Sequence, residues 1–258
     1  SDEVFNCLQQ NPKVGYAMDF FGKGNRAKKI ISYAASFGST TIDKIVQSGV
    51  EIELKERLQR FSSISVRDAN SARVIKELTD KNPVCHLDPV LIGRLEEKNW
   101  RKPKITDYLV VYGYKNRFST AEGKDILDFA KKKGLSVIVL AEPQLFCDNY
   151  IPCRPDEILG YVKNASYVVT DTFHGTIFST IFHKSVAVYC RKASKSGSTN
   201  AEKLLDLLNK LGMTGRLVSE KHTLDEILST DFDYSNVEKI RNKERVRTLN
   251  YLTENLSL

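Results

Sequence analysis

The spacing of hydrophobic and polar positions becomes regular after residue 105. Short runs of consecutive apolar residues predict buried strands at 109–112, 135–140, 167–169 and 186–189. Apolar residues that recur every three or four positions predict helices at 121–133, 155–164, 175–183 and 201–211. Continuous apolar strands that alternate with helices indicate a parallel sheet covered on both faces. This part of the chain is therefore predicted to have an α/β fold.

The chain before residue 98 shows a weaker form of the same alternation. Strand-like runs are predicted at 29–34, 63–66 and 84–91. Asp88 and Pro89 interrupt the last of these runs. Helical patterns are predicted at 41–60 and at a later segment through Leu78, which Asn70 or Ser71 could cap.

A change of composition at 96–104 indicates a domain boundary. Charged residues, Trp100 and Pro103 cluster there, just before the regular pattern begins. We therefore predict a first domain over 1–98, a second over 104–232, and a long polar helix over 233–258 that packs back across both.

The composition is that of an ordinary globular protein, with 41% apolar and 28% charged residues among 258. The net charge of +7 is scattered and no recognition motif accompanies it, so nucleic acid is not indicated as a partner. Most of the basic residues are predicted to form a solvated face. The excess of positive charge is compatible with an anionic substrate or with an anionic membrane surface. Five cysteines without a CxxC pair are predicted to be small buried hydrophobes in a reducing compartment, the cytoplasm.

The most informative run is TDTFHGT at 170–176, which follows the predicted strand at 167–169. In a parallel sheet, ligands collect where strands lead into helices, and a helix start favours anions. His174 could bind an anion as imidazolium or deliver a proton. Gly175 allows close backbone approach, and Thr176 could cap the helix or bond to an oxyanion. The alternative is structural: Asp171 or Thr172 caps the helix, and His174 only packs.

Arg67 follows another predicted strand and could fork onto a carboxylate or a phosphate. Its structural alternative is a salt bridge with Asp68 or Glu77. His86 is interpreted as a core histidine, and His222 as surface. No GxGxxG, HExxH or GxSxG motif occurs, and no cluster of side chains suggests a metal site.

Several runs, taken in order, resemble the polysaccharide pyruvyl transferase family. They are SDEVFN at 1–6, ISYAASFG at 31–38, SVRD at 65–68, LDPVL at 87–91, TDTFHGT at 170–176, and LLDLL at 204–208 with Gly212 and Arg216. Each run alone is short, but their order and spacing are fairly specific. The resemblance covers the chain from Ser1 to about Arg216.

The resemblance implies an α/β fold of two Rossmann-like domains that face a cleft, as in B-type glycosyltransferases. It implies phosphoenolpyruvate as the donor substrate, with no separate cofactor, and a sugar diol on a glycan or lipid-linked precursor as the acceptor. The product would be a pyruvyl ketal in a surface or capsular polysaccharide, made in the cytoplasm. Association with the inner face of the membrane and oligomerisation stay open.

The resemblance also assigns site residues. Arg67 and His174 match the donor-binding arginine and histidine of the family, and we give both a catalytic role. The remaining predicted contacts come from the same run and are Thr172, Phe173, Gly175 and Thr176. The family has a second arginine where this chain has Thr172. Lys192 or Lys195 could supply the missing charge.

The family's first domain opens with a strand and a small polar turn well before the Ser-Asp run. No such element precedes Ser1, so we expect the front of the first domain and part of the acceptor cleft to be missing from this chain. Two alternatives stay open. One is a nucleotide-sugar glycosyltransferase of the same architecture, and the other is a non-catalytic binding domain.

Overall fold

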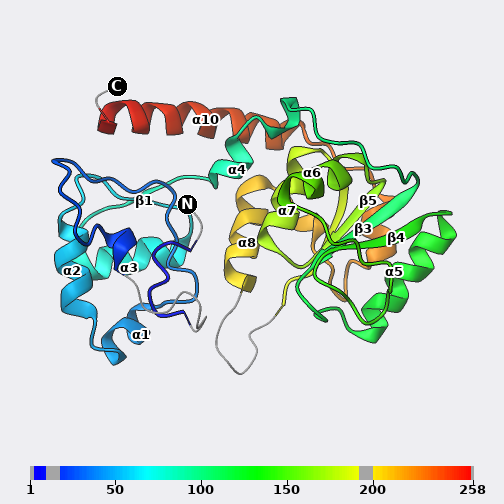
Figure 1. The fold of residues 1–258 in the computed structure, drawn as a ribbon, viewed down its shortest axis with the longest axis horizontal. Coiled ribbons are helices and arrows are strands. Elements are labelled where there is room, and N and C mark those ends of the chain that lie inside the picture. The colour runs from blue at the N-terminus through cyan, green and yellow to red at the C-terminus, as the bar shows by residue number, and fades with distance from the viewer. Residues whose placement is uncertain (1–2, 10–17, 192–199, 257–258) are drawn as a thin grey trace. The chain divides into compact units, whose positions relative to one another are not determined.

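The computed structural model describes residues 3–9, 18–191 and 200–256. They divide into two compact units (Figure 1). The first unit contains Ser1–Gly93 and Ile240–Leu258, and the second contains Arg94–Lys192 and Asn200–Lys239. The α/β fold class is confirmed, because both units carry parallel strands joined through helices.

The second unit is built on a four-stranded parallel sheet in the order β4-β3-β5-β6. The strands are β3 (Tyr108–Gly113), β4 (Ser136–Ala141), β5 (Tyr167–Thr170) and β6 (Ser185–Val188). Val110 pairs with Ile138 on one side and with Val168 on the other, and all three are fully buried. A strand buried on both faces needs apolar residues at every position, which explains the continuous apolar runs.

Helices cover both faces of this sheet, as predicted. They are α5 (Thr120–Lys132), α6 (Pro155–Asn164), α7 (Phe173–Ile181), α8 (Asn200–Leu211) and α9 (Leu224–Ser229). α5 and α9 share one core with the sheet, in which Ile126 and Leu224 pack with Leu109 and Val111. α7 contacts both α6 and α8 (Figure 1). Short 3-10 helices occur in both units: η1 (Asp19–Phe21) lies in the first unit, and η2 (Leu95–Glu97) and η3 (Thr214–Arg216) lie in the second.

The first unit is irregular around a small parallel sheet. Its elements are β1 (Ser65–Val66), β2 (Val84–Cys85), α1 (Ile42–Gln47), α2 (Glu51–Gln59), α3 (Ala69–Thr79) and α4 (Pro89–Ile92). An aromatic cluster fills its core, where Phe5 stacks on Phe21 with ring centroids 4.6 Å apart and Phe37 and Phe61 pack around them.

Four sequence predictions for the first unit need correction. The run at 29–34 is no regular strand, and only isolated parallel bridges at Ile31 and Ala35 reach β1 and its approach. The predicted helix at 41–60 is two helices, since Gly49 takes a left-handed φ of 71° between them. The third and fourth corrections concern α3 and α4, which acidic residues cap.

Asp68 caps α3 by accepting a hydrogen bond from the Ser71 amide at 2.8 Å, so neither Asn70 nor Ser71 is the cap. Asp88 caps α4 in the same way through the Val90 amide at 2.9 Å. The predicted strand at 84–91 therefore ends at Cys85 and turns into a helix.

The last helix, α10 (Ser235–Leu256), begins in the second unit and ends in the first. Most of its basic residues were predicted to be solvated, and Arg241 and Arg245 depart from that prediction. Arg241 is fully buried, and its Nε donates to the Leu91 carbonyl at 2.9 Å. Arg245 donates to the Ile92 carbonyl at 2.8 Å. These two bonds satisfy carbonyl groups at the end of α4, which has too few intrahelical partners of its own.

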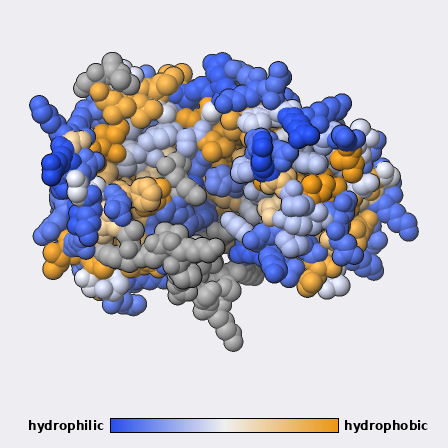
Figure 2. All heavy atoms as spheres, viewed as in Figure 1, coloured by the Kyte–Doolittle hydropathy of each residue, from blue (hydrophilic) through white to orange (hydrophobic). Residues whose placement is uncertain are grey.

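The surface of α10 from Ile240 onward carries several exposed apolar residues. Figure 2 shows hydrophobic residues gathered over this stretch, where Val246, Leu249 and Leu256 are exposed. Even so, none of the helices in the described part of the chain combines the length and apolarity that a membrane crossing needs.

All five cysteines carry free thiols. The prediction that they are buried holds for Cys7, whose pKa burial raises to about 11. The other four are half-buried.

His86 lies in the first unit's core, as predicted, with Nδ1 2.7 Å from the Ser65 hydroxyl and its ring beside Tyr251. Burial lowers its pKa below the usual 6.5. As the pH falls below 6.5, the unfolded chain therefore takes up this proton first, and the free energy of unfolding should decrease.

We expect His86→Phe to remove part of that pH dependence while keeping a ring in the core. Urea unfolding from about pH 8 to about pH 5 measures it. His222→Gln, at an exposed loop position, is the control and should follow the parent protein. An unchanged slope in His86→Phe would contradict the assignment.

Candidate functional site

The turn between β5 and α7 lies at the carboxyl edge of the second unit's sheet. Thr170 closes the strand, and its hydroxyl donates to the Tyr112 carbonyl of β3 at 2.7 Å. The Thr172 amide donates to the Thr170 hydroxyl at 3.1 Å. The turn is thereby tied to two neighbouring strands, and its direction is fixed before the helix begins.

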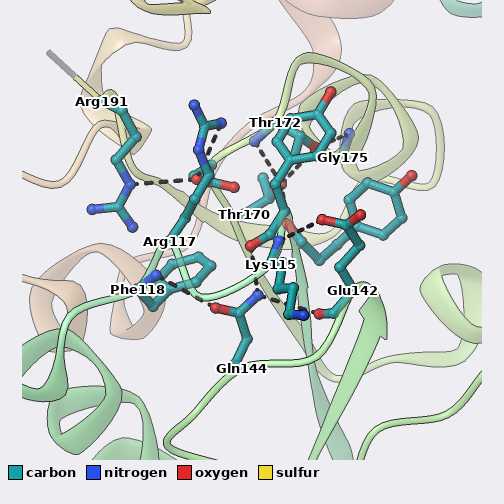
Figure 3. Close-up of polar contacts among 12 residues, drawn as sticks. Lys115, Arg117, Phe118, Glu142, Gln144, Thr170, Thr172, Gly175 and Arg191 are labelled. Atoms are coloured by element: carbon teal, nitrogen blue, oxygen red, sulfur yellow. Dashed lines mark hydrogen bonds and ion pairs between the residues drawn. The ribbon is translucent and has the colours of Figure 1, made fainter. Parts of the chain in front are cut away.

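Thr172 is the cap of α7. Its hydroxyl accepts from the Gly175 amide at 2.9 Å, so the helix begins at Phe173, two positions before the predicted start at 175 (Figure 3). The Thr176 hydroxyl donates back to the Thr172 carbonyl at 3.0 Å and is buried. The structural alternative is thus partly right: Thr172, not Asp171, serves as the cap.

Gly175 is required by the tightness of this turn. A Cβ placed on it would lie 2.1 Å from the Thr170 hydroxyl and 2.7 Å from the Thr172 hydroxyl. The Thr172 hydroxyl accepts from the Gly175 amide, and the Thr170 hydroxyl accepts from the Thr172 amide. The close backbone approach expected of this glycine is therefore made to the chain's own turn.

His174 occupies the second position of α7 and is half-buried. Its ring lies between Phe173 and Phe178, with centroid distances of 5.6 and 6.0 Å. The imidazole thus contacts two aromatic rings and keeps access to solvent. The amides of the first helical turn and the helix dipole favour an anion at this position.

Asp171, just before the cap, is almost completely buried and anchors a group of charges from three loops. Its Oδ2 lies 3.4 Å from Arg191 Nε, after β6, and 3.6 Å from Arg117 Nη1, after β3. Arg191 Nη1 also donates to Glu122 of α5 at 2.5 Å. Burial raises the pKa of the Asp171 carboxyl, and the two guanidinium charges oppose that rise.

Arg67, the other predicted catalytic residue, lies in the first unit, at the end of β1. Its Nη1 donates to Asp88 Oδ2 at 2.6 Å, and the two side chains are only 2% and 1% exposed. The salt-bridge partner is thus neither Asp68 nor Glu77. Asp68 is occupied as the cap of α3 and accepts a bond from the Ser36 hydroxyl at 2.6 Å. A donor-binding role for Arg67 stays a prediction.

The structure therefore brings together residues 170–176 with two arginines that sequence reasoning missed. Arg117 and Arg191 follow their strands by a few positions, as Arg67 does, and that placement was the available signal. Lys192 and Lys195, the predicted replacements, lie outside the described residues. Among the residues that the structure does describe, no group of His, Cys, Asp and Glu could hold a metal ion.

A parallel sheet with a capped helix start and cationic side chains at its carboxyl edge defines an α/β protein suited to binding a small anionic ligand there. The sequence comparison makes this specific. The family model for polysaccharide pyruvyl transferase matches residues 9–189, and the chain belongs to that family. The family prediction is confirmed, and it places the protein among transferases of polysaccharide biosynthesis. No curated protein matches the chain.

Solved structures resemble the chain only distantly. An α,α-trehalose-phosphate synthase (UDP-forming) from Burkholderia xenovorans, in complex with glucose-6-phosphate, is 10% identical with a TM-score of 0.48, over 93% of this chain and 67% of that one. The UDP-GlcNAc 2-epimerase of Methanocaldococcus jannaschii, in complex with UDP-GlcNAc and UDP, is 13% identical with a TM-score of 0.39, over 96% and 95%. This chain covers 65% of the length of an α,α-trehalose 6-phosphate synthase from Burkholderia multivorans. At these TM-scores the likenesses carry no conclusion about chemistry.

Gly175→Ala should disrupt the turn, because the added methyl group collides with both threonine hydroxyls. We expect the free energy of unfolding to fall by about 1–3 kcal/mol, although alanine has the higher helix propensity. Gly215→Ala is the matched control, since nothing lies within 4 Å of a Cβ there. Denaturant titration measures both, and equal stability of the two variants would contradict the role of Gly175.

Arg67→Met should remove the guanidinium group that lies 2.6 Å from the buried Asp88 carboxylate, at a cost of about 3–5 kcal/mol. Asp88→Asn added to it should recover part of the loss, because asparagine keeps the cap of α4 without the charge. The control is Arg57→Met, whose partner Glu53 is 41% exposed. Its unfolding free energy should change by about 0.5 kcal/mol or less. No recovery in the double variant would refute the ion-pair account.

Proposed function

We propose that this protein transfers the pyruvyl group of phosphoenolpyruvate onto two hydroxyls of a sugar as a ketal. The acceptor would be a glycan or lipid-linked precursor of a surface polysaccharide, modified in the cytoplasm. Family membership supports the reaction class, and the start of α7 carries the residue-level argument. There, a histidine in contact with two aromatic rings lies at the positive end of a nine-residue helix, at the carboxyl edge of a parallel sheet.

This arrangement suits the donor. Phosphoenolpyruvate carries a carboxylate and a phosphate, so binding requires cationic or N–H groups for both ends. The first turn of α7 provides amides and the helix dipole, and His174 provides an imidazole. The hydroxyls of Thr172 and Thr176 are engaged in the cap itself, so their predicted contact with substrate would come from the backbone.

The chemistry needs a proton and an exit for phosphate. A proton is added to the terminal carbon of the donor, which makes the central carbon electrophilic. A sugar hydroxyl forms a bond to that carbon and gives up its proton. The bond from the central carbon to the phosphate oxygen then breaks, and a second hydroxyl closes the ketal as its own proton leaves. His174 is our candidate for holding the anion and for delivering the first proton.

The reaction also needs a general base that takes the proton from the sugar hydroxyl of the acceptor. Asp68 and Asp171 are the carboxylates next to Arg67 and next to the Thr172 cap. Asp68 is bonded to Ser36 and caps α3, and Asp171 is paired with two arginines. Both carboxylates thus have structural partners in this structure, so neither is assigned as the base.

His174→Ala should weaken phosphoenolpyruvate binding by about tenfold or more, since a hydrogen bond to a charged group contributes about 1.5–3 kcal/mol. Calorimetric titration measures it, with the melting temperature as a check of folding. His222→Ala, which removes an exposed loop histidine, is the control and should bind as the parent protein does.

A parallel titration with UDP separates this proposal from a nucleotide-sugar glycosyltransferase. Binding of phosphoenolpyruvate but not UDP supports pyruvyl transfer. Binding of UDP alone would favour the glycosyltransferase, and binding of neither would favour a non-catalytic domain. Unchanged phosphoenolpyruvate affinity in His174→Ala would show that the site is misassigned.

A further inference from the structure

The chain has Thr172, the cap of α7, where the resemblance to the family implies a second arginine, so another group must meet the charge of the donor if the proposed function holds. Two arginines reach the same turn from the neighbouring loops. Arg191 Nε and Arg117 Nη1 lie 3.4 and 3.6 Å from Oδ2 of Asp171, the residue that precedes the Thr172 cap. Figure 3 shows both arginines beside the turn that Thr170, Thr172 and Gly175 form.

Aromatic rings hold both guanidinium groups in place. Arg191 lies over Phe118 and Tyr189, at 4.8 and 5.1 Å from the ring centroids. Arg117 lies over Tyr114 at 5.0 Å. Stacking of this kind fixes the plane of a guanidinium group without using its N–H donors. The two side chains stay 21% and 33% exposed, so both border solvent.

Each arginine also keeps a donor without an acceptor. Arg191 uses Nε for Asp171 and Nη1 for Glu122, whereas its Nη2 is buried and bonds to no acceptor among the described residues. Within the same described part of the chain, Arg117 Nη1 lies near Asp171 Oδ2 but makes no hydrogen bond. Buried donors left in this condition are costly, and they usually meet a ligand, an ion or water.

We infer that Arg117 and Arg191 form the cationic clamp for one anionic end of the donor, in place of the arginine that Thr172 replaces. This inference rests on the proposed function for the identity of the donor. Asp171 and Glu122 orient the two guanidinium groups, and N–H donors of these groups together with the start of α7 bind the carboxylate or phosphate.

The competing account is that the two arginines only neutralise Asp171 and Glu122, since the four charges sum to zero. The two accounts differ in what a lysine does. Arg117→Lys together with Arg191→Lys keeps both positive charges, so the buried carboxylate stays compensated and the fold is preserved. The same change removes the planar fork that a bidentate clamp needs.

The test is calorimetric titration of the protein with phosphoenolpyruvate and, separately, with inorganic phosphate. We expect the double lysine variant and the single variant Arg191→Gln to bind phosphoenolpyruvate about tenfold or more weakly. Arg101→Gln is the control in the same unit, because the Arg101 side chain is 78% exposed and pairs across the surface with Glu157. Its affinity should equal that of the parent protein.

The outcomes separate this inference from the proposed function. Parent-like affinity in the double lysine variant, with a lowered melting temperature alone, overturns the clamp and leaves pyruvyl transfer standing. If the parent protein binds phosphate but not phosphoenolpyruvate, and both arginine variants lose phosphate, the clamp stands and the proposed donor is wrong. If the parent protein binds neither ligand, the clamp is overturned as well.

Discussion

The structure of the candidate site depends on one tight turn between β5 and α7. The Thr170 hydroxyl ties the turn to β3, the Thr172 hydroxyl caps the Gly175 amide, and only glycine fits where the two hydroxyls meet. This arrangement decides where α7 begins and therefore where its positive end points. His174 and Asp171 flank the cap and take their positions from it.

Charge is the second constraint, and it follows from the first. The turn buries Asp171, and a buried carboxylate must be compensated or take up a proton. Arginines after β3 and β6 supply the compensation, which gathers cations at the sheet edge where ligands of parallel sheets bind. A structural requirement and a binding surface thus arise from the same residues. In the first unit, Arg67 also follows a strand and pairs with a buried carboxylate. There both side chains, Arg67 and Asp88, are almost fully buried.

The sequence predicted the second unit well and the first unit poorly. Strands buried on both faces leave continuous apolar runs, so β3 to β6 and the helices between them were found within a few residues. The first unit depends on isolated bridges and acidic caps, and these leave almost no periodic signal. Thr172 and His174 were found because they lie in one continuous run. Arg117 and Arg191 were missed because only the strand order β4-β3-β5-β6 places their loops next to that run.

The central claim is that the start of α7 holds an anionic donor. A crystal structure with phosphoenolpyruvate bound tests it most directly. The account predicts that the carboxylate or phosphate lies against the first-turn amides of α7, with His174 in contact and with guanidinium donors from Arg117 or Arg191 on the same ligand. Phosphoenolpyruvate bound elsewhere, such as in the basic hollow lined by Arg101, Lys102 and Lys104, with the α7 start unchanged, would contradict it.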